Sequence, residues 1–507
     1  MGDQRFDDIV VGAGSSGGVV AARLAEAGRR VALVEAGPDS PDPATAHRTL
    51  VDGRLAATQG FDWGYTAEPV PGRAPIVMPR GRVVGGCSAI NGSNALRPVP
   101  TDFDGWGPEW SWADVLPALR AMEDDPDGHG LHPDVHGRGG PIRITRFGLD
   151  GVELDPVQRA QWAAWGSLGF PDVADHNHPD GLGWGPTPMS LDGTARQSVT
   201  WRYLQAHRGG DRLTVIPDAL CDKVLVTDQR AVGVRLADGR ELHAPRVVIS
   251  AGAIATPGIL VRSGIGPADD LRRLGVPVVA DLPVGEGLQD HPAVYFTGVP
   301  PAGTYDARSA FVPWVARFTS PGSALPADLQ LMPFNRMPPA RRELGVRHVW
   351  YVVPSVQRVR ARGRVTVTSV DPNALPHIAC NYLGHPEDVA RMLVGMRLAW
   401  EVLRHPAMRA VTDRYLGLDD LLGPDGVERD PSDDELVALA LATVQTNYHP
   451  TGTAAIGPVV SARGAVHGLD GLYVADASVM PDVVSSNTNT TCLMIGERIG
   501  AWLAASA

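Results

Sequence analysis

The chain has 507 residues, of which 44% are hydrophobic and 20% charged, a composition typical of a folded protein and not of a disordered one. Its net charge of -12 argues against nucleic acid or an anionic membrane as the main partner. No run approaches the roughly 18 uninterrupted apolar residues of a spanning helix. The first apolar strand begins at Phe6 and leaves no room for a signal peptide, so we expect a cytoplasmic protein without a membrane span.

The first 35 residues predict a dinucleotide-binding βαβ unit. In chain order they form an apolar strand, a glycine-rich turn, an alanine-rich helix and a second strand, at residues 6–11, 12–17, 18–27 and 31–34. Gly12 permits the tight turn, Gly14 lets the backbone approach a pyrophosphate, and Gly17 lets helix and strand pack closely. Glu35 would accept hydrogen bonds from ribose hydroxyls. Taken alone, this unit allows NAD, NADP or FAD.

A second glycine-rich segment, residues 78–92, follows a stretch rich in proline and glycine. Its glycines indicate a backbone that packs closely against another group. In a chain that opens with a dinucleotide-binding unit, we expect this segment to contact the extended body of the cofactor.

The remaining chain alternates between two patterns. Residues 213–257 predict closely spaced strands that end in a strand–turn–helix unit, which belongs with the N-terminal unit. Residues 291–446 predict an antiparallel sheet, followed by helices at 386–403 and 433–444. A strand at 471–477 and a helix at 490–505 then return to the first pattern. The C-terminus therefore completes the N-terminal domain.

The chain resembles the glucose-methanol-choline (GMC) oxidoreductases, a family of flavoenzymes that oxidise alcohols with FAD. Six segments carry the resemblance in order: 12–35, 81–92, 252–266, 284–291, 448–453 and 487–489. The resemblance implies an α/β fold, α+β overall, in which a Rossmann-like FAD-binding domain is interleaved with a substrate domain built on an antiparallel sheet with helices. We expect a discontinuous FAD-binding domain at residues 1–150, 205–290 and 455–507. The substrate-binding domain is expected at residues 151–204 and 291–454.

The resemblance also implies which residues hold the cofactor. The glycine turn and Glu35 would hold the ADP half of FAD, Val224 would contact the adenine through its backbone, and Asp476 would reach the ribityl and pyrophosphate region. Some members attach FAD covalently through a histidine where this chain has Ile90, so we expect non-covalent FAD. The expected cofactor-binding residues are Gly12, Gly14, Ser15, Ser16, Glu35, Arg82, Gly86, Ser88, Asn91, Gly92, Val224, Asp476, Ala477 and Asn489.

Oxidation of an alcohol needs a base for the hydroxyl proton and a hydrogen-bond partner for the developing alkoxide. Histidine suits the first role because its pKa lies near neutrality. His449 matches the catalytic histidine of the family, and Asn489 matches its partner. Judged from the residues alone, without the resemblance, a lone His-Pro is more often structural. Asn487 and Asn489 would then be cap residues of the following helix. His291 is the main competing base, but the family uses its segment structurally.

We expect no metal site. His129, His132 and His136 have a spacing that matches no defined ligand motif, and they lie among Gly, Pro and Asp in an expected surface loop. The four cysteines lie far apart without CxxC spacing, which favours reduced thiols over a zinc site or a disulfide framework.

The substrate domain carries aromatic and methionine residues that could line an apolar pocket or fill a core: Phe311, Trp314, Phe318, Met332, Phe334, Met337, Trp350 and Tyr351. We expect a primary aromatic or apolar alcohol as substrate. We expect oxygen, a quinone or another electron acceptor. The polar Asn447 stands where some oxygen-using relatives carry a small apolar residue and would alter oxygen access to the flavin, so oxidase and dehydrogenase both stay open. Two alternatives stay open: hydroxynitrile lyase chemistry on the same fold, and electron transfer with a redox peptide or partner protein.

Overall fold

The computed structural model describes residues 6–55, 60–146, 154–304, 312–337, 348–422 and 426–506. One half is built on a five-stranded sheet in the order β12-β2-β1-β16-β29, in which every neighbouring pair is parallel. These strands are Leu213–Ile216, Val31–Val34, Asp8–Val11, Val247–Ile249 and Leu472–Val474. Segments from both ends and the middle of the chain thus share one sheet, which confirms the predicted dinucleotide-binding architecture.

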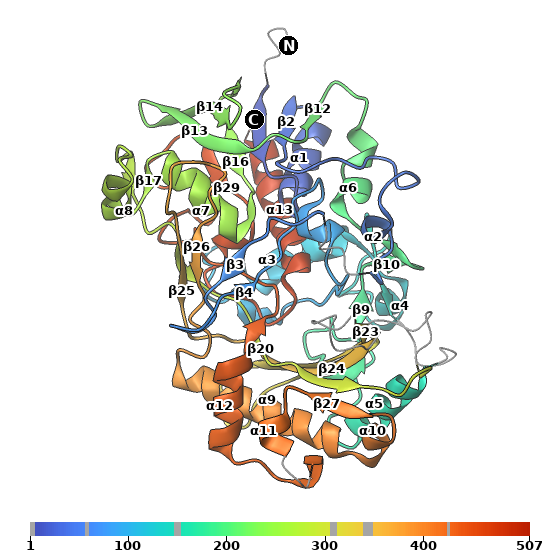
Figure 1. Ribbon diagram of the computed structural model, residues 1–507. Helices are drawn as coiled ribbons and strands as arrows, with labels where there is room; N and C mark the ends of the chain where they lie inside the picture. Colours follow the sequence, from blue (N-terminus) through green and yellow to red (C-terminus); the bar gives the residue numbers. More distant parts are fainter. Residues whose placement is uncertain are drawn as a thin grey trace.

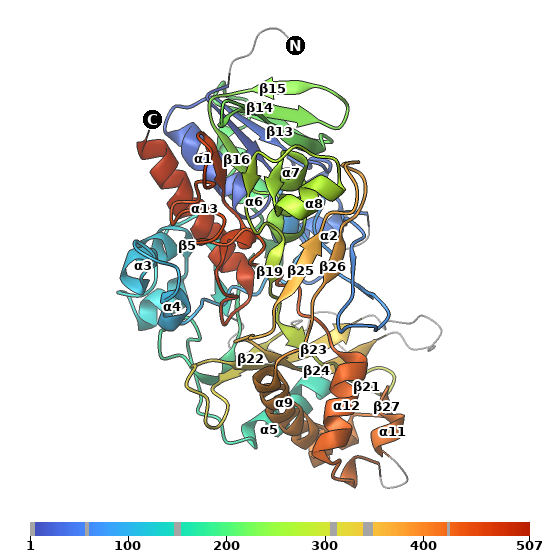
Figure 2. The same ribbon diagram turned by 90° about the vertical axis from the view of Figure 1, so that its left-hand side faces the viewer.

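Helices α1 (Gly17–Glu26) and α13 (Thr488–Ala505) lie side by side against this sheet (Figures 1 and 2). The close approach depends on small residues, since a Cβ atom on Gly496 would lie 2.6 Å from the Ser16 carbonyl oxygen. Both helices begin near the carboxyl ends of the strands. Their N-termini therefore face the edge where α/β sheets bind ligands.

The other half is built on an eight-stranded antiparallel sheet, ordered β27-β21-β24-β23-β22-β8 with β20 and β28 attached. Its strands are Arg414–Leu416, Phe296–Val299, Val349–Val356, Leu329–Met337, Trp314–Phe318, Gly183–Pro186, Pro292–Ala293 and Gln445–Thr446. Helices α5 (Pro156–Gly166), α9 (Pro386–Arg404) and α12 (Asp433–Thr443) cover the side of the sheet away from the first half (Figure 1). The predicted antiparallel sheet and its helices are therefore confirmed.

The two halves have separate apolar cores, one under the parallel sheet and one between the antiparallel sheet and its helices. Two segments pack with the half opposite to their expected domain. Val199 and Leu204 belong to the first core, whereas Tyr65 and Met78 belong to the second. The domain boundaries themselves stay a prediction.

Shorter elements connect and extend the two halves. A three-stranded antiparallel sheet contains β13 (Cys221–Thr227), β14 (Arg230–Leu236) and β15 (Glu241–His243), and a second contains β19 (Glu286–Leu288), β25 (Gly363–Thr366) and β26 (His377–Ala379). The other helices are α2 (Arg48–Val51), α3 (Trp112–Ala121), α4 (Pro126–Leu131), α6 (Val199–Arg202), α7 (Gly252–Arg262), α8 (Ala268–Arg273), α10 (Pro406–Ala410) and α11 (Asp419–Leu422). Within the described ranges, no helix has the length and hydropathy needed to cross a membrane.

Candidate active site

A cavity of about 630 Å³ extends from the glycine turn after β1 to the antiparallel sheet of the other half. Gly12 and Gly14 line one end, and Tyr295, Phe334 and Tyr351 line the other. Its volume falls in the range of natural small-molecule sites. Both halves of the molecule therefore contribute to one binding site.

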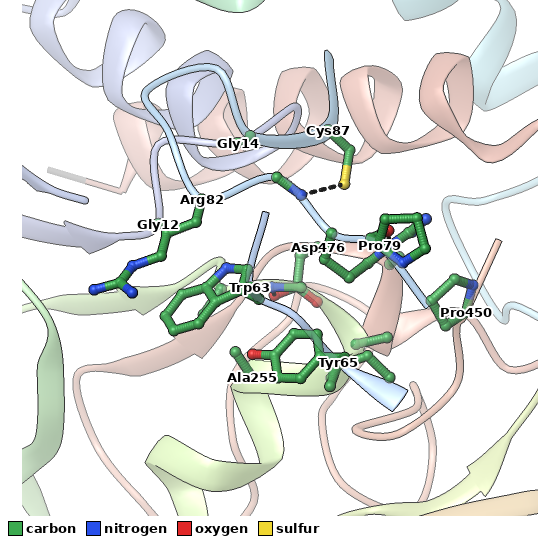
Figure 3. Close-up of a pocket in the computed structure, with 18 of the residues that line it drawn as sticks. Gly12, Gly14, Trp63, Tyr65, Pro79, Arg82, Cys87, Ala255, Pro450 and Asp476 are labelled. Atoms are coloured by element: carbon green, nitrogen blue, oxygen red, sulfur yellow. Dashed lines mark hydrogen bonds between the residues drawn. The ribbon is translucent and has the colours of Figure 1, made fainter. Parts of the chain in front are cut away.

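The glycine-rich segments meet at the cofactor end of this cavity. Gly12 has φ 99°, and a Cβ atom there would lie 2.4 Å from the Ser250 carbonyl oxygen. A Cβ atom on Gly86 would lie 2.7 Å from Gly14 Cα, so the segment at 81–92 packs directly on the first turn. Neither position accepts a side chain without a shift of backbone. Figure 3 shows Gly14 beside this segment, with helices behind them.

The residues at this end fit an FAD pyrophosphate. The N-cap residue Ser16 of α1 makes no capping hydrogen bond with its side chain and lines the cavity. The leading N–H groups of this helix and its positive dipole end are thus available to an anion. Glu35 accepts hydrogen bonds from the Ala13 and Gly37 amides at 3.0 and 2.9 Å, and burial raises its pKa to about 7.

Arg82 and Trp63 form a further part of this wall. The Arg82 guanidinium carbon lies 4.9 Å from the Trp63 ring centroid, a cation–π contact (Figure 3). Asp476 is buried, and its carboxylate accepts hydrogen bonds from the Gly252 amide and the Thr256 hydroxyl. The pKa of Asp476 is raised by burial.

Of the expected cofactor residues, all except Ser88 and Val224 line the cavity. The Ser88 hydroxyl donates to the Gly85 carbonyl and stabilises the glycine-rich segment on the side away from the cavity. The Val224 amide donates to the Ser263 hydroxyl at 2.8 Å, within β13, and Val224 does not line the cavity; its contact with adenine stays a prediction. Cys221 lines the cavity instead. Cys221 follows the turn at the carboxyl end of β12. Because α/β sheets bind ligands at the carboxyl ends of their strands, this position could have been predicted from the sequence.

Two histidines meet at the other end of the cofactor site. His449 lines the cavity, and its Nδ1 lies 2.9 Å from Nδ1 of the fully buried His291. The second ring nitrogen of His291 lies 2.9 Å from the Val484 carbonyl oxygen. The structure therefore places His291, which sequence reasoning set aside, directly behind the expected base.

The buried carboxylate of Asp290 fixes the backbone of both histidines. Its Oδ1 accepts hydrogen bonds from the His291 amide at 2.8 Å and the His449 amide at 2.7 Å. Its Oδ2 accepts from the hydroxyls of Tyr382 and Thr446. Asp290 thus holds the main chain of the pair, and the two rings bond to each other.

The expected partner of His449 is corrected by the structure. Asn487 Nδ2 lies 3.3 Å from His449 Nε2, whereas Asn489 Oδ1 accepts a hydrogen bond from the Ser15 hydroxyl at 2.7 Å. Residues two apart at the start of a helix point in different directions, so both asparagines cannot face the same ring. Asn487 faces the histidine and Asn489 faces the glycine turn. Asn487 Oδ1 is buried and has no hydrogen-bond partner among the described residues.

Both rings are uncharged in this site. Burial, the neighbouring His291 and the Arg80 guanidinium hold the pKa of His449 well below its usual value. Burial also lowers the pKa of His291 to about 3. A neutral imidazole has an unprotonated nitrogen, which is the form a general base requires.

The residue before His449 has an unusual backbone. Tyr448 has φ 68°, in the left-handed region that a bulky side chain rarely adopts. Its amide donates to the Thr446 hydroxyl at 2.7 Å, which stabilises this conformation. Such outliers concentrate at functional sites.

The substrate end of the cavity is aromatic. Tyr295 lies between Tyr351, at a centroid distance of 5.4 Å, and Phe334, at 6.5 Å. Of the aromatic and methionine residues proposed from sequence, Phe334 and Tyr351 line the cavity. Four others pack in apolar cores: Trp314, Phe318, Met332 and Trp350. Phe311 lies outside the described residues, and the side chain of Met337 is not described. Sequence reasoning missed Tyr295 and Arg80, which also line the cavity.

His136 does not lie in a surface loop, as was expected for the cluster with His129 and His132. It is fully buried, with Nδ1 2.9 Å from Glu123 and Nε2 2.8 Å from Asp175. Asp125 lies close enough to complete a group of possible metal ligands with Glu123 and His136. Arg97 and Arg146, however, pair with these carboxylates, and the pKa of His136 is raised to about 10 against the opposing effect of burial. The group is therefore a charge-balanced ion network.

Comparison with known proteins agrees with this geometry. Two family models described as GMC oxidoreductase match the chain, one over residues 6–293 and one over residues 359–496. The oxygen-dependent choline dehydrogenase of Yersinia pseudotuberculosis is 35% identical, and the alignment covers 97% of this chain and 93% of that protein. The enzyme of the same name from Pseudomonas aeruginosa is also 35% identical, with 98% and 94% covered.

Solved structures share the fold over the whole chain. Pyridoxine 4-oxidase from Mesorbium loti has a TM-score of 0.85 at 26% identity, and 98% of this chain and 99% of that chain are covered. A fungal aryl-alcohol oxidase has a TM-score of 0.81 at 22% identity, with 99% of both chains covered. The latter likeness shows the fold alone.

Proposed function

The chain belongs to the GMC oxidoreductase family and is an FAD-dependent alcohol oxidoreductase, and we propose that it oxidises a primary aromatic or apolar alcohol to the aldehyde with His449 as the base. The observation that carries this proposal is the position of the His449 ring, which stands with Asn487 on the wall of the cavity that the cofactor residues line. The named relatives are dehydrogenases and oxidases, which favours oxidation over the lyase and electron-transfer alternatives.

The residues divide the chemistry between them. His449 Nε2 accepts the hydroxyl proton of the alcohol, and the Asn487 amide donates to the oxygen as negative charge develops there. FAD, which the glycine turn, Glu35 and Asp476 would hold, would supply the acceptor for the hydride of the carbinol carbon. The alcohol thus loses one proton and one hydride and becomes the aldehyde.

We propose that FAD is held without a covalent bond. Ile90 lines the cavity and offers no nucleophilic atom. After acid precipitation of the protein, the flavin is expected in the supernatant. Flavin absorbance that stays with the precipitate would contradict non-covalent attachment.

The aromatic wall supports the substrate class. Tyr295, Phe334 and Tyr351 give flat apolar surfaces on which an aryl group can stack. The curated relatives are named choline dehydrogenases, and aromatic side chains also bind quaternary ammonium groups. At this end of the cavity, however, the charged lining residue is the cation Arg80, and the lining carboxylates Glu35 and Asp476 belong to the cofactor end. A neutral substrate suits this charge pattern better.

Anaerobic reduction of the flavin tests both parts of the proposal. Benzyl alcohol, hexanol, choline and glucose are mixed separately with the oxidised enzyme, and loss of flavin absorbance is followed. Benzyl alcohol or hexanol should reduce the flavin faster than choline or glucose. Faster reduction by choline would overturn the substrate class, and no reduction by any alcohol in the panel would count against alcohol oxidation.

The acceptor is proposed to be oxygen or a quinone-type compound. Asn447 is buried beside the site, where its amide approaches the Ser355 hydroxyl at 3.4 Å. Photoreduced enzyme is exposed to air and, in a separate anaerobic sample, to a soluble quinone. The faster reoxidation identifies the acceptor class, and failure of both would refute the proposal.

A further inference from the structure

The hydrogen bonds around the two histidines determine where their protons lie. The Val484 carbonyl oxygen can only accept, so the proton of the neutral His291 ring is on Nε2, 2.9 Å away. His291 Nδ1 is then unprotonated and can only accept. Its partner at 2.9 Å, His449 Nδ1, must therefore donate.

The same reasoning continues to the reacting atom. A neutral His449 ring with its proton on Nδ1 has a free lone pair on Nε2. That nitrogen faces the Asn487 amide at 3.3 Å, on the cavity wall. An Nε2–H tautomer would instead place two unprotonated Nδ1 atoms against each other and leave no base toward the cavity.

We propose that His291 is a positioning residue that selects the catalytically competent tautomer of His449 by accepting the proton of its Nδ1. The inference rests on the proposed role of His449 and assigns a function to the ring behind it. His291 does not touch the substrate. It acts through the orientation and the proton position of the base.

The main chain around the pair has the register that this role requires. Strand β20, which follows His291, pairs antiparallel with β28, which precedes His449: Pro292 lies opposite Thr446. On the other side of the histidines, the amides and carbonyls of Gln289 and Thr451 hydrogen-bond reciprocally at 3.1 and 2.8 Å. The two segments are thus fixed on both sides of the rings, whose planes cross at 73° with centroids 5.0 Å apart.

The charges that face the pair agree with two neutral rings. Asp290 uses its oxygens for the two backbone amides and for the Tyr382 and Thr446 hydroxyls. The cations that act on the rings are Arg80, which faces His449, and Arg358, which faces His291, and both disfavour an imidazolium. No carboxylate is hydrogen-bonded to either ring among the described residues. Tautomer selection must therefore come from His291 and the backbone carbonyls that act on its ring, those of Val484 and Gln357.

Two amide substitutions separate the two hydrogen bonds of His291. In His291→Asn the side-chain oxygen can take the place of Nδ1 and keep an acceptor for His449. In His291→Gln the side-chain amide reaches the place of Nε2, which keeps the donor to Val484 but removes the acceptor near His449. Both variants lose an aromatic ring from the same buried position, so each serves as the matched control for the other.

The expected result is a difference in kcat between the two variants. His291→Gln should lower the rate of anaerobic flavin reduction about 10²-fold with little change in the apparent affinity for alcohol, because the base is then partly in the wrong tautomer. His291→Asn should restore most of that loss. Equal losses in both variants, or a greater loss in the asparagine variant, would overturn tautomer selection and leave His291 as packing alone.

A spectroscopic measurement tests the inference without turnover. Enzyme containing FAD is labelled with ¹⁵N-histidine, and the His449 signals are assigned by their loss in His449→Gln. The proposal requires a protonated Nδ1 and an unprotonated Nε2 in the parent enzyme and a mixture of tautomers in His291→Gln. A parent ring protonated on Nε2 would refute it. If no alcohol reduces the parent flavin, the proposed function fails, whereas the NMR result still decides on the tautomer.

Discussion

Two buried histidine environments in this molecule have opposite charge states. His449 and His291 bond to each other and to carbonyl and amide groups, and both pKa values are lowered. His136 is also fully buried but lies between Glu123 and Asp175, and its pKa is raised to about 10. Burial is common to both sites. The chemistry of the hydrogen-bond partners decides which ring carries a charge.

This difference separates a reactive histidine from a structural one. A base must be unprotonated and must be able to accept a proton, which suits the ring without a carboxylate partner. A ring that carboxylates keep protonated at neutral pH cannot accept a further proton and can only hold neighbouring segments together. His136 joins the segments that contain Glu123 and Asp175 in this way.

The largest effect is expected at the neutral pair. His449→Gln keeps a polar side chain but removes the base, so kcat/KM should fall about 10³-fold, which corresponds to about 4 kcal/mol in the transition state. Steady-state kinetics at full flavin occupancy measures the loss. His132→Gln, a histidine substitution outside the site, is the control and should keep parent activity. A fall of less than tenfold in His449→Gln would remove His449 from the role of base.

The charged network should determine stability and not rate. His136→Leu leaves three buried carboxylates facing two arginines and is expected to lower the free energy of unfolding by about 3–5 kcal/mol. Urea unfolding of the FAD-bound enzyme measures this change. At a temperature where the variant stays folded, its kcat should equal that of the parent. A stable His136→Leu variant with impaired turnover would reverse the comparison.

The next effect distinguishes the two asparagines. Asn487→Ala removes the amide beside His449 Nε2 and should lower kcat about 10²-fold. Asn489→Ala removes the acceptor of the Ser15 hydroxyl and should mainly weaken FAD binding, because this residue faces the glycine turn. Flavin titration and flavin reduction at saturating FAD separate these outcomes. The opposite pattern would restore Asn489 as the partner of the base.

The smallest effects are expected from pH, and their signs differ between the two sites. Because the pKa of His449 is lowered, its base form persists below pH 6.5, and kcat/KM should begin to fall only at more acidic pH. The pKa of His136 is raised from 6.5 to about 10, so its stabilising contribution is complete below pH 6.5 and is lost as the pH rises toward 10. The unfolding difference between parent and His136→Gln should shrink over that interval. A difference that grows with pH would contradict a charged His136.

Local patterns in the sequence predicted much of the cofactor side. The order of strand, glycine turn, helix and acidic residue limits the backbone strongly, and Gly12, Gly14 and Glu35 all line the cavity as expected. The non-covalent attachment and the roles of these residues stay predictions. Val224 shows the limit of such patterns, since Cys221 at the start of β13 lines the cavity whereas Val224, three residues later in the same strand, does not.

The histidine environments could not be predicted in the same way. The contact between His291 and His449 joins residues 158 positions apart, and it depends on the pairing of two short strands. The choice between Asn487 and Asn489 depends on where a helix begins, to within a single residue. His136 is buried because its charge is balanced by residues distant in the sequence, such as Asp175, which no local pattern near the histidine reveals.

Anaerobic stopped-flow mixing with benzyl alcohol, in the parent enzyme and in His449→Gln with the same FAD occupancy, tests the central claim most directly. The account predicts rapid loss of flavin absorbance in the parent and a rate about 10³-fold lower in the variant. Equal rates in the two proteins would contradict the assignment of His449 as the base.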